Sequence, residues 1–308
     1  MKKILLTGSS GFVGTNLSKA FKDDFALLGL DVFNKGNIDK GSFFTWDNLE
    51  LLPEADLIIH LAGKAHDTSN TVLEKEYFDV NVGLTKKIFD HFLKSSAQKF
   101  IFFSSVKAIA DTVKGDRLLE EDEPCPLTPY GKSKLEAEFY IQSYTLPENK
   151  KIYILRPAMI HGPGNKGNLN LLYQLVKRGI PWPLGAFDNR RSFASIDNVI
   201  FILRQLISRN IPSGIFQIAD DVPLSTNELI RLMAEELQKN VRILRIPVTF
   251  VRAASKLGDL LHLPLNSERL KKLTETYIVS NDKIKRMLEI DVLPTDSETG
   301  MRKTLKSF

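Results

Sequence analysis

The sequence predicts an α/β protein in which a doubly wound parallel sheet is joined to a smaller C-terminal domain. Short apolar runs alternate with amphipathic stretches through the first half of the 308 residues. A glycine-rich turn, TGSSGFVG, joins the first apolar run to the first helical pattern. After Pro157 the alternation gives way to long loops and helical patterns, which indicates a second structural unit.

The apolar runs of the first half are expected to form the strands of the sheet. Each run is bounded by polar turns, and amphipathic segments of helical spacing separate several of them. Strands that alternate with helices favour a parallel sheet covered on both faces. The expected strands are 2–8, 25–32, 55–63, 99–105 and 151–157, and the expected helices are 12–21, 72–93 and 130–144.

The second half is expected to combine a smaller domain with segments that return to the sheet. A glycine-rich loop, HGPGNKGN, is followed by a helical pattern at 169–179, and GIFQIAD at 214–220 has the character of a strand. Ser225 or Thr226 can cap the next helix, with Glu228 in its first turn. We therefore divide the chain into 1–157, with return segments near 191–218, and 158–308.

Composition excludes several classes of protein. The net charge is +5, but the late basic residues alternate with apolar ones at helical spacing, so we expect solvated helix faces and no nucleic-acid partner. The five histidines lack metal-ligand spacing, and the single cysteine, Cys125, cannot form an internal disulfide or a zinc site. One cysteine suits a reducing cytoplasm.

No membrane span is expected, because no run approaches 18 continuous apolar residues. The first apolar run stops after Leu6, too early for a signal peptide. The apolar stretch TFVRAASKLGDLLHL, residues 249–263, allows either a membrane-surface helix or a helix packed in its own domain, and we expect the second.

The turn TGSSGFVG has the composition of a phosphate-binding loop. Glycines at 8, 11 and 14 permit a tight turn and a close backbone approach to a pyrophosphate at the helix N-terminus. The spacing is GxxGxxG and not GxGxxG, so a plain strand–helix turn is the alternative. Asp31 ends the second expected strand, where a carboxylate accepts ribose hydroxyls and repels a 2′-phosphate, favouring NAD over NADP. An ordinary turn aspartate is the alternative there.

Tyr130 and Lys134 have the spacing of a proton-transfer pair. Four residues apart, they share one helix face. Useful phenolate at neutral pH requires the tyrosine pKa to fall by about three units, which a neighbouring ammonium and a positive nicotinamide ring can promote. The pattern YxxxK gains specificity from the upstream FIFFSS, which ends in Ser105.

These motifs together resemble the NAD-dependent epimerase/dehydratase family, the extended short-chain dehydrogenases. Six motifs follow in the order typical of that family, and the resemblance covers essentially the whole chain. They are TGSSGFVG, HLAG, NVG, FFSS, PYGKSK and LRPAMIHGPG. The resemblance implies a Rossmann-type NAD-binding domain at 1–157 and a mainly substrate-binding domain at 158–308. It also implies a homodimer formed through the helices near 72–95 and 130–144.

The resemblance assigns roles to individual residues. Ser105 and Tyr130 would bind the sugar hydroxyl or ketone, with Tyr130 as proton carrier, and Lys134 would hold the nicotinamide ribose and lower the tyrosine pKa. The remaining residues implied for NAD binding are Gly8, Ser10, Gly11, Phe12, Val13, Gly14, Asp31, Asp47, Leu61, Ala62, Gly63, Lys64, Asn81 and Pro157, with Asp47 and Lys64 as weaker matches.

Departures from the family pattern narrow the expected reaction. Sugar 4,6-dehydratases carry an acid pair where this chain has Val106 and Lys107, so we expect no dehydration. Met159 replaces an asparagine that contacts substrate in many relatives. His161 could also touch substrate.

SSVKA, GPGNKGN and NRRSF resemble the bacterial UDP-N-acetylquinovosamine 4-dehydrogenase group, which reduces a 4-keto sugar nucleotide. By that likeness Asn168 and Arg191 would face the UDP diphosphate, with Arg190 as a poorer substitute. A surface arginine is the alternative for Arg191.

The expected function is therefore NAD-dependent hydride transfer at C4 of a UDP-sugar, with reduction of a 4-keto-6-deoxy-N-acetylhexosamine as the leading reaction. A UDP-sugar 4-epimerase is the alternative within the family. A catalytically idle NAD-binding sensor or interaction protein is the alternative of another class, and the joint presence of Ser105, Tyr130 and Lys134 argues against it.

Overall fold

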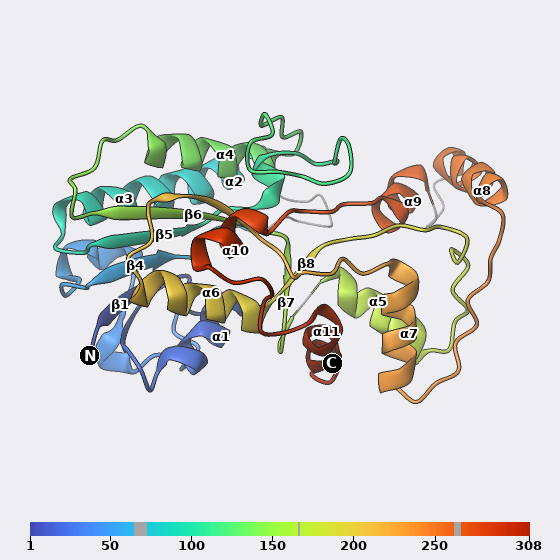
Figure 1. The fold of residues 1–308 in the computed structure, drawn as a ribbon, viewed down its shortest axis with the longest axis horizontal. Coiled ribbons are helices and arrows are strands. Elements are labelled where there is room, and N and C mark those ends of the chain that lie inside the picture. Colours follow the sequence, from blue (N-terminus) through green and yellow to red (C-terminus); the bar gives the residue numbers. More distant parts are fainter. Residues whose placement is uncertain (65–72, 166, 262–265) are drawn as a thin grey trace.

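A parallel sheet of seven strands forms the larger part of the protein (Figure 1). The computed structural model describes residues 1–64, 73–165, 167–261 and 266–308. The strand order is β3-β2-β1-β4-β5-β6-β9, which confirms the predicted α/β doubly wound fold. The strands are β1 (Lys3–Thr7), β2 (Ala26–Leu30), β3 (Phe43–Phe44), β4 (Leu57–His60), β5 (Lys99–Phe103), β6 (Lys151–Pro157) and β9 (Gly214–Ile218).

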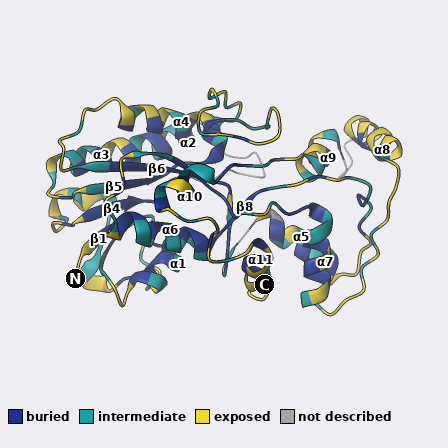
Figure 2. Ribbon diagram, in the orientation of Figure 1, coloured by how far each residue is buried: buried dark blue, intermediate teal, exposed yellow. Residues whose placement is uncertain are grey.

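The sheet is buried because its apolar runs point side chains to both faces. On β1, Ile4 and Leu6 belong to one hydrophobic cluster and Leu5 to another. The first face is covered by α1 (Phe12–Phe21), α6 (Ile196–Ser208) and α10 (Asp282–Leu288). The other face is covered by α3 (Gly83–Lys94) and α4 (Pro129–Gln142). Figure 2 shows these strands as the most deeply buried layer.

The strand order reverses between β2 and β4, which both pair with β1 in parallel. Ligands of open α/β sheets bind at such a switch point, outside the carboxyl ends of the strands. The glycine-rich turn follows β1 directly, so the chain reaches this position at its first strand-to-helix connection.

Two segments were not expected at the sheet. The edge strand β3 has only two residues, too few for a recognisable apolar run. Helix α10 lies far along the chain yet packs against β9 and the core of the sheet, through Ile284 and Leu288. The boundaries 1–157 and 158–308 stay a prediction.

The smaller part packs around its own hydrophobic cluster, to the right of the sheet in Figure 1. Its short sheet pairs β7 (Met159–His161) with β8 (Phe193–Ser195). Ser225 caps α7 as predicted, and Glu228 completes a capping box with the Ser225 backbone. The helices are α5 (Asn168–Lys177), α7 (Thr226–Glu236), α8 (Val248–Leu260), α9 (Ser267–Thr274) and α11 (Ser297–Leu305).

Helix α8 covers residues 249–260 of the stretch that allows a membrane-surface helix or a packed helix, and residues 262 and 263 of that stretch lie outside the described part of the structure. It packs against α9 and buries Val251, Ser255 and Gly258, so it is a helix of its domain. Its other face is exposed. Among the described residues, no helix combines the length and the apolar character needed to cross a bilayer.

Candidate active site

A pocket of about 620 Å³ lies where the strands of the sheet end and the smaller part begins. This volume is within the range of small-molecule sites. Its wall contains the glycine-rich turn, the ends of β4, β5 and β6, the start of α4 and three residues from β8 and the loop before it. The lining residues are Gly8, Gly11, Phe12, Val13, Gly14, Leu61, Gly63, Lys64, Phe103, Ser104, Ser105, Val106, Lys107, Tyr130, Lys134, Pro157, Ala158, Met159, Ile160, Asn165, Gly167, Arg191, Ser192, Phe193 and Tyr277.

The glycine-rich turn forms a cradle that side chains would fill. Gly8 has a φ of 68°, in the left-handed region, and a Cβ there would lie 2.7 Å from the Ala62 nitrogen. A Cβ at Gly14 would collide with the carbonyl oxygen of Gly8. Gly11 is the N-cap of α1 and has no side chain to cap it, so the first N–H groups of the helix lack partners within the helix, and this turn lines the pocket. This geometry fits a dinucleotide pyrophosphate.

Asp31 lies beside this turn, immediately after β2. Its carboxylate accepts hydrogen bonds from the backbone N–H groups of Ser10 at 2.8 Å and Val32 at 2.7 Å. The Ser10 hydroxyl donates to the Phe33 carbonyl at 2.5 Å. Asp31 and Ser10 are therefore fixed next to the cradle but outside the pocket lining, and Asp47 is exposed in the short helix Trp46–Leu51.

Asn81 lies behind the pocket wall and joins two of its segments. Its Oδ1 accepts from the Lys64 N–H at 2.7 Å, and its Nδ2 donates to the Ser133 hydroxyl at 2.9 Å. A π-helical turn, Phe78–Val82, between α2 (Glu74–Tyr77) and α3 supplies this residue, which is fully buried. Asn81 therefore positions the Leu61–Lys64 segment against α4.

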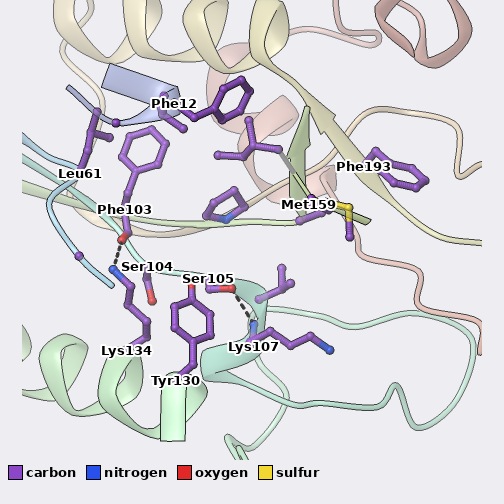
Figure 3. A pocket seen from close by; sticks show the side chains of 18 of the residues that line it. Phe12, Leu61, Phe103, Ser104, Ser105, Lys107, Tyr130, Lys134, Met159 and Phe193 are labelled. Carbon is purple, nitrogen blue, oxygen red and sulfur yellow. Dashed lines mark hydrogen bonds between the residues drawn. The ribbon is translucent and has the colours of Figure 1, made fainter. Parts of the chain in front are cut away.

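Ser105, Tyr130 and Lys134 meet at the pocket, as Figure 3 shows. Thr128 caps α4 by accepting a hydrogen bond from the Gly131 N–H at 3.2 Å, which starts the helix just before Tyr130. Lys134 follows one turn later and donates from Nζ to the Phe103 carbonyl at 2.9 Å. The helix start and the end of β5 thus bring the three residues together.

Burial shifts the pKa of both members of the YxxxK pattern. The pKa of Tyr130 is raised, since burial outweighs the effect of its hydrogen bond with Ser105. Burial lowers the pKa of Lys134 to about 8, and Glu138 opposes that shift. The surroundings of Tyr130 therefore do not by themselves produce the predicted lowering, and the contribution of a nicotinamide charge stays a prediction.

A buried ion pair, which no sequence motif predicted, connects α4 to the sheet. Arg156, on β6, donates to Glu138 with Nε at 3.0 Å and with Nη2 at 2.6 Å. The Ser104 hydroxyl also donates to Glu138. Glu138 is one turn beyond Lys134, so the pair ties α4 to β5 and β6. The sequence offered two signals of this pair: Glu138 is a charged residue four positions after Lys134, and Arg156 is a charged residue inside an apolar run.

Two cations line the opposite end of the pocket. The Lys107 Nζ lies 4.1 Å from the centre of the Tyr277 ring and donates to the Asp111 carbonyl at 2.9 Å. The Arg191 Nε donates to the Glu275 carbonyl at 3.2 Å. Burial lowers the pKa of both side chains, and the nearby Arg191 cation lowers the pKa of Lys107 further. This end of the pocket is suited to an anionic group.

Other candidate residues differ in how they relate to the pocket. Met159 lines it, and Arg190 is exposed outside the lining. Asn168 opens α5 beside the lining residue Gly167, and its side chain lies outside the described part of the structure. Tyr277 was missed because no local motif marks it; tertiary packing alone brings it from late in the chain.

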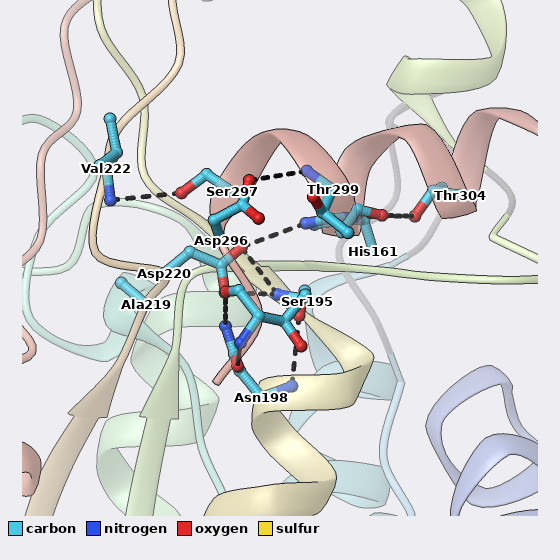
Figure 4. A network of polar contacts seen from close by, with 12 residues as sticks. His161, Ser195, Asn198, Ala219, Asp220, Val222, Asp296, Ser297, Thr299 and Thr304 are labelled. Atoms are coloured by element: carbon cyan, nitrogen blue, oxygen red, sulfur yellow. Dashed lines mark hydrogen bonds and ion pairs between the residues drawn. The ribbon is translucent and has the colours of Figure 1, made fainter. Parts of the chain in front are cut away.

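The histidines near the site are structural. His60 is fully buried between the hydroxyls of Thr7 at 2.6 Å and Thr85 at 2.9 Å. His161 is also fully buried and contacts Thr304 Oγ1 at 2.8 Å and Asp220 at 3.3 Å, as Figure 4 shows. The expectation that His161 could touch substrate is not met in this arrangement, because both ring nitrogens bond within the protein and it is outside the pocket lining.

The chain is similar in sequence to several known proteins. The sequence model of a family described as "NAD dependent epimerase/dehydratase family" matches residues 4–219. The chain is 30% identical over 321 residues to a UDP-glucose 4-epimerase of Vibrio cholerae, covering 100% of this chain and 95% of the relative. It is 28% identical to an N-acetyl-alpha-D-glucosaminyl-diphospho-ditrans,octacis-undecaprenol 4-epimerase of Escherichia coli O157:H7, covering 92% and 84% of the two chains.

The fold is also similar to solved structures. A UDP-glucose 4-epimerase of Thermotoga maritima, solved with UDP-glucose, superposes with a TM-score of 0.78 at 20% identity and covers 99% of this chain and 98% of its own.

Proposed function

The chain belongs to the NAD-dependent epimerase/dehydratase family and is an NAD-dependent enzyme, and from this premise we propose that it transfers hydride at C4 of a UDP-sugar. The observation that carries the proposal is the meeting of Ser105, Tyr130 and Lys134 in one pocket with the glycine cradle. When bound, NAD accepts a hydride from the sugar or returns one. The residues of the chain handle the proton and hold the sugar.

Tyr130 is the proposed proton carrier. It lies at the pocket wall, and its hydroxyl group interacts with that of Ser105. Oxidation of a C4 hydroxyl releases one proton with each hydride, so a base must take it, and Tyr130 returns it when the ketone is reduced. Lys134 supports this role as a nearby cation, and Ser105 orients the C4 oxygen.

Lys107 and Arg191 support a nucleoside-diphosphate substrate. Both line the pocket end remote from the cradle, where they provide positive charge for phosphate oxygens. We propose that Arg191 contacts the diphosphate, together with Asn168 at the start of α5.

Two reactions share this C4 chemistry. The likeness of SSVKA, GPGNKGN and NRRSF to the 4-dehydrogenase group favours a reductase of a 4-keto-6-deoxy-N-acetylhexosamine. The two named relatives are 4-epimerases, and the first matches essentially the whole chain, which favours a 4-epimerase. We take the epimerase as the first candidate and the reductase as the second.

Elimination of water is not proposed. Val106 is a buried apolar residue, and the Lys107 Nζ donates to a carbonyl oxygen. Neither side chain supplies the acid and base pair used by the sugar 4,6-dehydratases. The purified protein should form no 4-keto-6-deoxy product from UDP-N-acetylglucosamine.

Cofactor stoichiometry separates the two candidates. The first assay supplies UDP-glucose or UDP-N-acetylglucosamine without added NADH and measures the C4 epimer by chromatography. The second supplies UDP-4-keto-6-deoxy-N-acetylglucosamine with NADH and compares NADH consumed with sugar reduced. Epimer without net NADH consumption supports the epimerase, whereas one NADH for each sugar supports the reductase. Absence of both reactions over a broad sugar-nucleotide panel would favour the idle NAD-binding alternative.

We also propose a cytoplasmic homodimer formed through α3 and α4. The exposed side chain of Phe139 on α4 supports an interface there. Sedimentation velocity should give a dimer for the full chain and a monomer for Phe139→Glu. A wild-type monomer at micromolar concentration would contradict the dimer without affecting the proposed reaction.

A further inference from the structure

Helix α8 exposes a continuous apolar face. Its exposed apolar residues recur at spacings of three and four, so they form one stripe along a helix about 20 Å long. The exposed fractions are 69% for Phe250, 54% for Leu257, 74% for Leu260 and 56% for Leu261. The stripe comprises Phe250, Ala253, Ala254, Leu257, Leu260 and Leu261, which we call the α8 stripe.

The stripe is distinct from the face by which α8 belongs to its domain. Val251, Ser255 and Gly258 lie on the other side of the helix, and Val251 shares a cluster with Leu270 of α9. Figures 1 and 2 show α8 at the end of the molecule away from the sheet, with most of its surface exposed. The domain fold therefore presents this apolar surface outward, and such contiguous patches commonly mark an interaction site.

The charge around the stripe is strongly positive. Residues 242–274 contain seven lysines and arginines and two acidic residues. Their net charge is therefore +5, the same as the net charge of the whole chain. Arg252 and Lys256 are exposed on α8, and Arg242 and Arg245 precede it. These four side chains form no ion pair within the described ranges.

The combination of apolar and basic residues on α8 indicates which kind of partner can bind there. A second copy of this chain, packed through the same face, would place two basic segments against each other, which is unfavourable. An anionic lipid surface accepts both features, because the apolar stripe enters the boundary with the acyl chains while lysine and arginine contact the headgroups. We propose that the α8 stripe is a peripheral binding site for an anionic membrane.

The α8 stripe is separate from the pocket. None of the stripe residues lines the pocket. Helix α9 packs on α8, and the residue after it, Glu275, accepts the hydrogen bond of Arg191 at the pocket end. Helix α9 and Glu275 therefore lie between the α8 stripe and the substrate end of the pocket along the chain. The α8 stripe itself takes no part in the proposed reaction.

Vesicle co-sedimentation tests the proposal with the full chain and no substrate. The probes are vesicles of phosphatidylcholine alone and vesicles of phosphatidylcholine mixed with phosphatidylglycerol. We expect binding to the anionic vesicles to be at least ~10-fold stronger, and to weaken as salt is added, because screening reduces the charge attraction. Equal binding to both vesicles, or binding to neither, would overturn the proposal.

Substitutions locate the binding surface. The double variant Phe250→Asp/Leu257→Asp should lose ~10-fold or more of the vesicle binding, since it places charge in the stripe. The matched control is Val292→Asp, an exposed aliphatic residue elsewhere on the surface, which should bind like wild type. Arg252→Glu/Lys256→Glu should lose the preference for anionic lipid, whereas the exposed control Lys22→Glu should keep it.

Two readouts distinguish the other outcomes. Turnover of a soluble sugar nucleotide by Phe250→Asp/Leu257→Asp should equal that of wild type, which shows that the fold and the reaction are intact. If that variant instead changes the sedimentation velocity from a larger oligomer to a smaller one, a second copy covers the stripe and the membrane proposal is wrong. Failure of the C4 reaction in wild type would leave the vesicle result unaffected.

Discussion

The buried pair of Glu138 and Arg156 offers a sharp test of how α4 is held against the sheet. Glu138 is fully buried and Arg156 is 3% exposed. The substitution Glu138→Gln keeps the size of the side chain but removes its charge, and this leaves the Arg156 guanidinium buried without its counter-ion. The Ser104 hydroxyl also loses a charged acceptor.

The magnitude follows from the burial of both partners. Removing one member of a buried ion pair costs about 3–5 kcal/mol, because the remaining charge is not solvated. For a chain of this size each kcal/mol lowers the melting temperature by about 2–4 °C, so a decrease on the order of 10 °C is expected. The pair's net contribution is smaller, so Glu138→Leu/Arg156→Met should recover part of the loss.

Urea unfolding followed by circular dichroism measures the change in the free energy of unfolding. The matched control is Glu136→Gln, an exposed glutamate two residues earlier on the same helix, which should change the free energy of unfolding by no more than about 0.5 kcal/mol. A similarly small change for Glu138→Gln would refute the reasoning, since it would mean that Arg156 finds solvent or another partner at little cost.

Three further predictions concern the pocket. Tyr130→Phe should retain NAD binding, measured by calorimetry, and lose about 100-fold or more in turnover; turnover within a few-fold of wild type would remove Tyr130 from the mechanism. Asp31→Asn should reduce the preference for NADH over NADPH, and tighter NADPH binding by wild type would exclude Asp31 as the ribose ligand. The pKa of Lys134 is lowered from 10.5 to about 8. The folded state therefore holds fewer protons between these values, and the free energy of unfolding relative to Lys134→Met should rise by about 3 kcal/mol as pH increases across that window. A pH-independent difference would refute the shift.

The sequence by itself determined the fold class and the principal motifs. The apolar runs of β1, β4, β5 and β6 are local signals, because a strand covered on both faces needs apolar residues throughout. The glycine-rich turn and YxxxK are also local, since a tight turn and one face of a helix depend only on spacing along the chain. The same is true of the capping box at Ser225.

Only the tertiary structure decided which distant residues share the pocket and which face of each helix is covered. Tyr277 and Arg191 reach one pocket end, and α10 returns to the sheet, through packing between segments far apart in the chain. His161 lies within a conspicuous motif, yet its partners Asp220 and Thr304 make it structural. The amphipathic pattern of α8 allowed either a packed or an exposed apolar face. Periodicity defines the stripe, but its exposure depends on where α9 and the rest of the domain lie.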